Sequence, residues 1–160
     1  MSTEDAAPVA APEVTGPPPH LLIVRAPYYR AVVDGLTAGA QRIIAAAGAS
    51  AEVLDVAGAF ELAQAIRLAL RGRTRFDGFV ALGCVVRGET DHYQFICQAS
   101  MQGLMDVALA YGIALGTGLL TVDTLGQAEA RAGAEGPNKG AEAAAAALRQ
   151  IDAGRRLGAL

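Results

Sequence analysis

A polar segment, Arg87 to Tyr93, directly follows one of the most apolar runs of the chain, Phe79 to Val86. Gly88, Glu89 and Thr90 of this segment stand where a helix is expected to begin. The first backbone N–H groups of a helix have no partner within it, and glycine lets a ligand approach the backbone. The pattern therefore predicts an anion site, most simply for a phosphate, with Thr90 either capping the helix or donating its hydroxyl to the anion.

One of the two histidines, His92, follows in the first turn of the same predicted helix. A neutral imidazole can act as a general base or a proton shuttle near neutral pH, so we predict proton transfer by His92 beside the anion. Three cations are candidates to hold the anion: Arg87, Arg131 and Lys139. Each of them alone is as readily a solvated surface charge.

Aromatic side chains follow three of the predicted strands. Tyr28 and Tyr29 come after the first strand, Phe60 after the second and Tyr93 after the third. Ligands of open parallel sheets bind outside the carboxyl ends of the strands. Aromatic side chains there either cap the sheet as core residues or stack on a flat ring, and together they favour a planar ligand.

Runs of apolar residues alternate with segments of helical period along the chain. We expect strands at residues 20–26, 51–58, within 76–86 and at 113–123, and helices over 28–48, 59–72, about 90–111, near 125–132 and from 138. Strands that are apolar throughout imply a parallel sheet covered on both faces. With right-handed crossovers, the fold class is an α/β three-layer sandwich with a four-stranded parallel sheet in flavodoxin-like order.

The 160 residues suit one compact domain, residues 20–160, preceded by a flexible proline-rich tail over residues 1–19. The net charge of −3 and the absence of a basic tract argue against nucleic acid, and no apolar stretch approaches a membrane span. The N-terminal residues lack the pattern of a secretory signal, so we expect a cytoplasmic protein. Its two cysteines, Cys84 and Cys97, are then free thiols rather than a disulfide, and no metal-ligand pattern occurs.

The predicted helix over 90–111 is apolar nearly all round, and the mean hydropathy of the chain is +0.32. Such a helix needs burial on more than one side. Either the chain is simply rich in alanine, or it buries extra surface against copies of itself, and we favour a homo-oligomer.

Four stretches together resemble the 6,7-dimethyl-8-ribityllumazine synthase family. They are GAFELA (58–63), GFVALGCVVRGETDHY (78–93), GLLTVDTLGQAEARAG (118–133) and NKGAEAA (138–144), which occur in the family's order and spacing. The resemblance implies a transferase of riboflavin biosynthesis. Such an enzyme condenses 5-amino-6-(D-ribitylamino)uracil with 3,4-dihydroxy-2-butanone 4-phosphate, and it needs no metal or organic cofactor. The resemblance also implies that the chain forms pentamers. The short loop over 132–140 is of the kind seen in relatives that build sixty-subunit shells of pentamers.

The resemblance also implies roles for individual residues. It matches His92 to the acid/base histidine. It matches Glu89, Thr90 and Arg131 to the phosphate site, with Arg131 in an environment shared between subunits and with Arg87, Gly88 and Lys139 as further candidates. The residues matched to the pyrimidine and the ribityl chain are Tyr28, Ala59, Phe60, Glu61, Cys84, Val85, Val86 and Thr117.

This sequence departs from the family pattern at Pro27, Arg30, Ala57 and Thr117. These changes leave the phosphate and histidine positions intact but alter the surroundings of the pyrimidine. Two alternatives to the enzyme follow: a catalytically weak paralogue that binds flavin or lumazine, and a scaffold that forms a shell.

Overall fold

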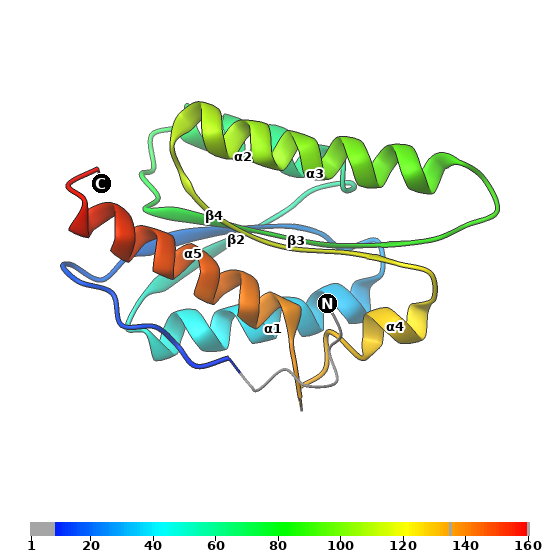
Figure 1. Ribbon diagram of the computed structural model, residues 1–160, viewed down its shortest axis with the longest axis horizontal. Helices are drawn as coiled ribbons and strands as arrows, with labels where there is room; N and C mark the ends of the chain where they lie inside the picture. The colour runs from blue at the N-terminus through cyan, green and yellow to red at the C-terminus, as the bar shows by residue number, and fades with distance from the viewer. Residues whose placement is uncertain (1–8, 135, 160) are drawn as a thin grey trace.

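The computed structural model describes residues 9–134 and 136–159, and it confirms the predicted order of strands and helices. Figure 1 shows them as three layers. The elements are β1 (His20–Ala26), α1 (Arg30–Ala46), β2 (Ser50–Asp55), α2 (Glu61–Leu70), β3 (Gly78–Val86), α3 (His92–Tyr111), β4 (Ala114–Val122), α4 (Leu125–Glu129) and α5 (Lys139–Arg156).

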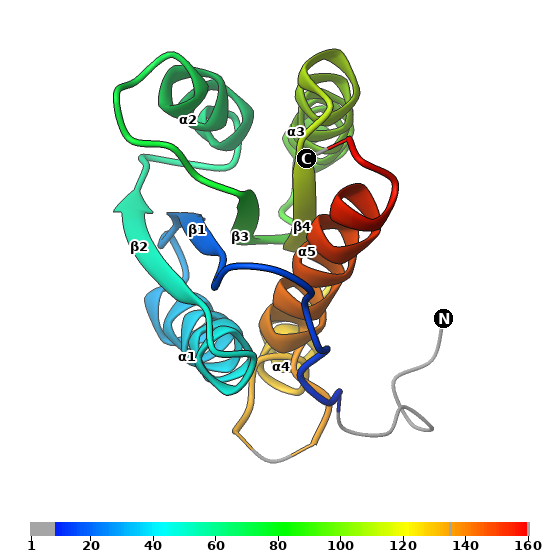
Figure 2. The same ribbon diagram turned by 90° about the vertical axis from the view of Figure 1, so that its left-hand side faces the viewer.

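The four strands form one parallel sheet in the order β2-β1-β3-β4, which is the predicted flavodoxin-like order. Helices α2 and α3 cover one face, and α1, α4 and α5 cover the other (Figures 1 and 2). Because every strand runs the same way, the turns that follow the strands gather at one edge of the sheet. The predicted fold class is therefore confirmed, and the predicted chemistry lies at that edge.

Both faces of β1 and β3 are buried. Along β1, Leu21 and Ile23 pack among the residues of α1 and α5, whereas Leu22 and Val24 pack among those of α2 and α3. Successive side chains of a strand point to opposite faces of the sheet. Because helices cover both faces, every side chain of such a strand is buried, and its sequence is apolar throughout. Strand β2 differs from this expectation: it is an edge strand, and most of its residues, including Val53 and Leu54, are exposed.

Helix α5 lies unusually close to β4 and α1. A side chain at Gly116 of β4 would overlap the backbone oxygen of Ala143, and one at Gly140 of α5 would overlap the backbone oxygen of Leu36. Glycine at these two positions therefore lets backbones touch directly. The alanines of α5 that face this contact are fully buried.

Asn138 fixes the start of α5. Its side-chain oxygen accepts a hydrogen bond from the Ala141 N–H, which is the N-cap bond of the helix. Its side-chain nitrogen donates to the backbone oxygens of Gly35, Ala132 and Gly133 at 3.0 to 3.1 Å. One side chain, only 4% exposed, thus joins α1, the end of the α4 turn and α5.

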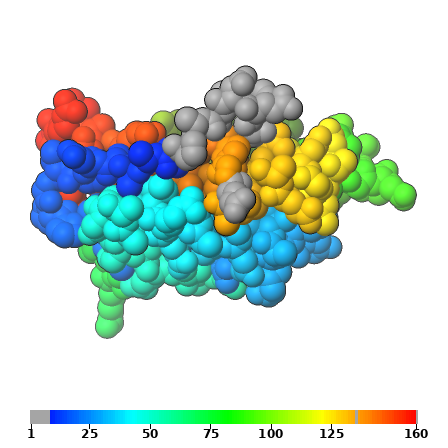
Figure 3. Space-filling view, turned by 90° about the horizontal axis from the view of Figure 1, so that it is seen from below, coloured from blue at the N-terminus to red at the C-terminus, as the bar shows by residue number. Residues whose placement is uncertain are grey.

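Residues 9–19 of the predicted N-terminal tail run along α5, and residues 1–8 lie outside the described residues. Both the N–H and the hydroxyl of Thr15 donate to Asp152 Oδ1, at 2.9 and 2.8 Å. Arg155 donates to the backbone oxygens of Thr15 and Pro17, each at 2.7 Å. Figure 3 shows this segment as a blue band beside the orange of α5.

Helix α3 covers the sheet with a narrow stripe: Ser100, Leu104 and Val107 are its buried residues. Its other apolar side chains are exposed in the protomer, among them Phe95, Met101, Met105, Leu109 and Tyr111. Within the described ranges, no helix is both long and apolar enough to cross a membrane.

The close contact at Gly140 gives a first prediction. Gly140→Ala should lower the free energy of unfolding by about 1–3 kcal/mol, because the added methyl group meets backbone that cannot move aside without shifting the helix. The urea midpoint of unfolding measures this change.

The matched control is Gly126→Ala in α4, where the new methyl group would meet nothing within 4 Å. It should leave the midpoint unchanged or raise it slightly, since alanine favours a helix. Equal midpoints for the two variants would contradict the proposed close packing.

Candidate active site

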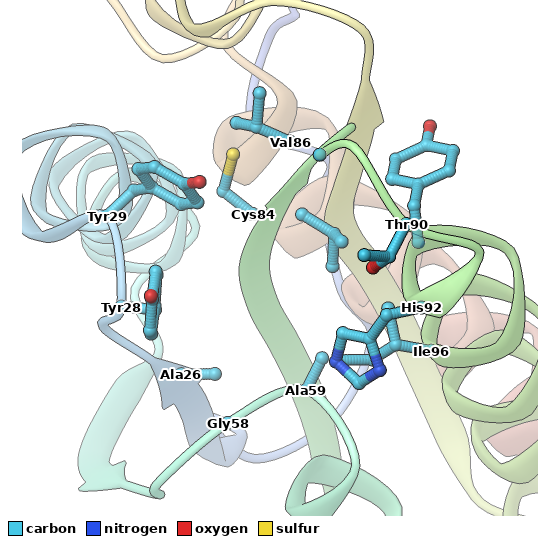
Figure 4. Close-up of a pocket in the computed structure, with 13 residues that line it drawn as sticks. Ala26, Tyr28, Tyr29, Gly58, Ala59, Cys84, Val86, Thr90, His92 and Ile96 are labelled. Carbon is cyan, nitrogen blue, oxygen red and sulfur yellow. The ribbon is translucent and has the colours of Figure 1, made fainter.

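A cavity of about 250 Å³ opens at the carboxyl ends of the strands. It is lined by the end of β1 and the turn after it, by the β2–α2 turn, by the end of β3 and by the start of α3 (Figure 4). This is where open parallel sheets bind their ligands. The position agrees with the place at which the sequence concentrates aromatic and polar residues.

Tyr28 and Tyr29 form one wall of the cavity. Their rings meet edge to face, with centroids 5.2 Å apart and planes at 65°. Tyr28 is 79% exposed, so it is not a core residue that caps the sheet. His92 lines the cavity, and its ring meets that of Phe60, which does not itself line the cavity, with centroids 6.3 Å apart. The exposed ring of Tyr28 is available to stack on a flat ligand.

The end of β3 forms the floor, through Cys84, Val85 and Val86. Burial raises the pKa of the Cys84 thiol to about 11. The thiol is therefore neutral at physiological pH and acts as an apolar surface rather than as a nucleophile. The β2–α2 turn adds Gly58 and the buried Ala59.

The predicted anion site lies on the α3 side of the cavity, where Gly88, Thr90 and His92 line it (Figure 4). Helix α3 begins at His92, two residues later than expected, and its N-cap is Asp91, which makes no side-chain cap bond. Thr90 is therefore not the N-cap of the helix, and its role as a ligand of the anion stays a prediction. Glu89 is exposed and does not line the cavity.

Arg87 is engaged with protein groups at this edge. Its Nε donates to Asp123 Oδ1 at 2.6 Å, and its guanidinium carbon lies 4.3 Å from the centre of the Tyr93 ring. Asp123 follows directly after β4. Tyr93 lines the cavity, so Arg87 contacts a wall residue without lining the cavity itself.

Three predicted site residues lie away from this cavity within the protomer: Thr117, Arg131 and Lys139. Thr117 stands in the middle of β4, opposite Ala81, and its side chain is exposed. Arg131 follows α4, and Lys139 opens α5. Glu61, the first residue of α2, also does not line the cavity.

Of the aromatics expected at the strand ends, Tyr29 and Tyr93 also line the cavity. The structure adds Ala26, Gly58 and Ile96 to its wall. A signal for Ile96 was present, because it stands four residues after His92 and so shares a face of the helix with it. Ala26 and Gly58 carry no chemical signal of their own, and only the assembled sheet edge identifies them. Within residues 9–134 and 136–159 no cluster of three His, Cys, Asp or Glu side chains could hold a metal ion.

The fold and the cavity define an α/β protein with a ligand site at the carboxyl edge of a parallel sheet, suited to a flat ring beside an anion. The sequence profile of the 6,7-dimethyl-8-ribityllumazine synthase family matches residues 18–155. The chain belongs to this family, which confirms the resemblance identified from the sequence.

Individual relatives match along nearly the whole chain. The chain is 44% identical to 6,7-dimethyl-8-ribityllumazine synthase 1 of Rhizobium meliloti (strain 1021), over 89% of this chain and 95% of that protein. It is 43% identical to the synthase of Azorhizobium caulinodans over 98% of each chain. It is 44% identical to that of Agrobacterium fabrum (strain C58), over 88% of this chain and 97% of that protein.

The buried thiol gives a prediction about the cavity floor. Alkylation of Cys84 by iodoacetamide should be slow at pH 8, since a pKa near 11 instead of the usual 9 lowers the thiolate fraction roughly 100-fold. The rate should rise steeply as the pH approaches 11. Mass spectrometry of the Cys84 peptide measures the rate.

The control is the same peptide in urea-unfolded protein, where the thiol recovers its ordinary pKa and is fully accessible. A folded protein that labels at Cys84 as fast as the unfolded one would contradict a buried floor.

Proposed function

We propose that this protein condenses 5-amino-6-(D-ribitylamino)uracil with 3,4-dihydroxy-2-butanone 4-phosphate to give 6,7-dimethyl-8-ribityllumazine, phosphate and water. This is the penultimate step of riboflavin biosynthesis, carried out by a transferase that acts on small molecules. One observation carries the proposal: a single cavity has the aromatic wall of Tyr28 on one side and Gly88, Thr90 and His92 on the other.

The two sides of the cavity suit the two substrates. The uracil ring stacks on Tyr28, and the ribityl chain lies along the β2–α2 turn at Ala59, Phe60 and Glu61. Cys84, Val85 and Val86 at the end of β3 bound the ring through backbone groups. The phosphate of the second substrate lies against Gly88 and Thr90.

The reaction then proceeds through proton transfers that His92 can perform. The 5-amino group attacks the ketone carbon, and loss of water gives an imine. Removal of a proton from the adjacent carbon lets the phosphate leave with its bonding electrons. The enol left by this elimination tautomerises to a new ketone. Attack of the ribitylamino nitrogen on that ketone closes the ring and releases a second water. His92, which lines the cavity beside Phe60, is the general acid and base of these steps.

We further propose that neighbouring subunits complete the site and that the assembly is a pentamer. Thr117, Arg131 and Lys139 would then face the cavity of the next subunit, where Arg131 binds the phosphate and Glu89 borders it. The uncovered apolar surface of α3 supports contact between subunits, because its exposed side chains lie beyond the buried stripe. The cytoplasmic location stays a prediction.

The direct test of the function is an activity assay. Purified protein given both substrates should form the fluorescent lumazine well above the protein-free rate. Tight binding of flavin or lumazine without turnover would instead select the weak paralogue, and a rate equal to that of the protein-free control would exclude the enzyme.

Arg131→Ala sharpens this test. It should raise KM for the butanone phosphate roughly tenfold or more, because a charge-assisted hydrogen bond contributes about 1.5–3 kcal/mol, while KM for the uracil changes little. Arg42→Ala, which removes an exposed arginine of α1, is the matched control and should change neither constant. Parallel increases in both KM values for Arg131→Ala would argue against a phosphate role.

The assembly gives a prediction of its own. Leu109→Asp should convert the pentamer, or a shell of pentamers, into smaller species, because it places a carboxylate on the most exposed large apolar residue of α3. Sedimentation velocity measures the change. Gln41→Asp adds the same charge to an exposed position of α1 and should not alter the sedimentation. A monomeric parent protein would contradict the assembly outright.

A further inference from the structure

Arg87 connects three segments at the rim of the cavity. Its backbone N–H donates to the Val122 oxygen at 2.9 Å and so extends the pairing of β3 with β4 by one residue. Its Nε donates to Asp123 Oδ1 at 2.6 Å, and its guanidinium lies over the ring of Tyr93 in the first turn of α3. A planar guanidinium can make an ion pair along its edge and a cation–π contact on its face at once.

The connection continues from Asp123 into the next turn. The Asp123 N–H donates to Gln127 Oε1 at 2.9 Å, and Gln127 forms a capping box with Thr124 at the start of α4. The backbone oxygen of Gln127 accepts from Arg131 Nη1 at 2.8 Å. A continuous set of polar contacts therefore runs from Tyr93 through Arg87 to Arg131.

Within the described residues, few other contacts hold the turn that carries Gly88 and Thr90, although the Tyr93 side chain also hydrogen-bonds Thr121 of β4. No side chain caps α3 at Asp91, and a Cβ added at Gly88 would meet no atom within 4 Å. The side chains of Arg87 and Asp123 are 49% and 62% exposed, so their pairing adds little to the stability of the fold. Its consequence is geometric: it determines where the turn lies relative to β4.

We propose that Arg87 is a positioning residue of the active site: with Asp123 and Tyr93 it holds the turn bearing Gly88, Thr90 and His92 in the geometry that binds phosphate. The inference rests on the proposed function, since it concerns the phosphate site of that same reaction. Arg87 does not itself bind the phosphate, because its charge is already paired with Asp123.

Four variants test this role: Arg87→Ala, Asp123→Ala, the double variant and Arg87→Lys. Each alanine variant should raise KM for the butanone phosphate about tenfold and leave KM for the uracil within twofold. The double variant should be no worse than either single one, because both remove the same contact. Arg87→Lys keeps the charge but not the flat guanidinium, and it should recover part of the loss.

The other outcomes overturn the proposal. If Arg87 were a phosphate ligand, Asp123→Ala would free it, and KM for the butanone phosphate would stay the same or fall. If the pair were only structural, both KM values would stay unchanged and only the melting temperature or the active fraction would drop. Arg156→Ala, which removes an exposed arginine near Asp152 in α5, is the matched control and should have no effect.

Binding of inorganic phosphate, measured by equilibrium dialysis, separates this inference from the proposed function. Arg87→Ala and Asp123→Ala should each weaken phosphate binding about tenfold, whether or not the parent protein turns over the two substrates. A parent protein without turnover would refute the function alone. Unchanged phosphate binding in both variants, or no phosphate binding by the parent protein, would refute the positioning role.

Discussion

The direct backbone contact of α5 with β4 and α1 is the constraint on which the rest of the structure depends. Glycine at positions 35, 39, 116 and 140 removes the side chains that would otherwise keep these elements apart. Only at this separation can Asn138 reach the oxygens of Gly35, Ala132 and Gly133 and still cap α5. Asn138 thereby fixes the segment between α4 and α5, which carries Arg131, and the start of α5, which carries Lys139. A packing feature on one face of the sheet thus determines where two candidate cations of the site lie.

The same contact explains much of the unusual composition. Most alanines of α5 are buried, because a helix that approaches a sheet so closely has no room for larger side chains on that face. The high mean hydropathy therefore has two sources. One is the alanine-rich contact inside the protomer, and the other is the apolar surface of α3, which the protomer leaves uncovered. The sequence alone could not separate them, because alanine counts as apolar in either setting.

The sequence predicted the order of the elements and the edge that carries the site, since both follow from local patterns. Short runs that are apolar throughout, and helices ended by Gly48 and Gly112, can be recognised without knowledge of distant contacts. The bonds that position the site are of another kind. The side chain of Asn138 hydrogen-bonds Gly35, which lies 103 positions away in the sequence, and that of Arg87 bonds Asp123, which lies 36 positions away. Nothing local distinguishes these residues from a loop asparagine or a solvated arginine. The exposure of β2 likewise follows from its place at the edge of the sheet rather than from its own residues.

The residues of the site differ in how firmly the rest of the protein holds them in place. Cys84 lies in β3 within the packed core, and the backbone N–H of Tyr28 is bonded to the oxygen of Ala26 at the end of β1. Gly88, Thr90 and His92 belong to a turn and a helix start with few such contacts, yet in the proposed reaction they would meet the charged part of the substrate. Displacement of a reacting group by about 1 Å can cost roughly 100-fold in rate, which far exceeds what an exposed ion pair adds to folding stability. Contacts that are unimportant for stability can therefore be decisive for catalysis. The exposed pair of Arg87 and Asp123 is such a contact, because it joins the weakly supported turn to the end of a strand that the sheet holds firmly.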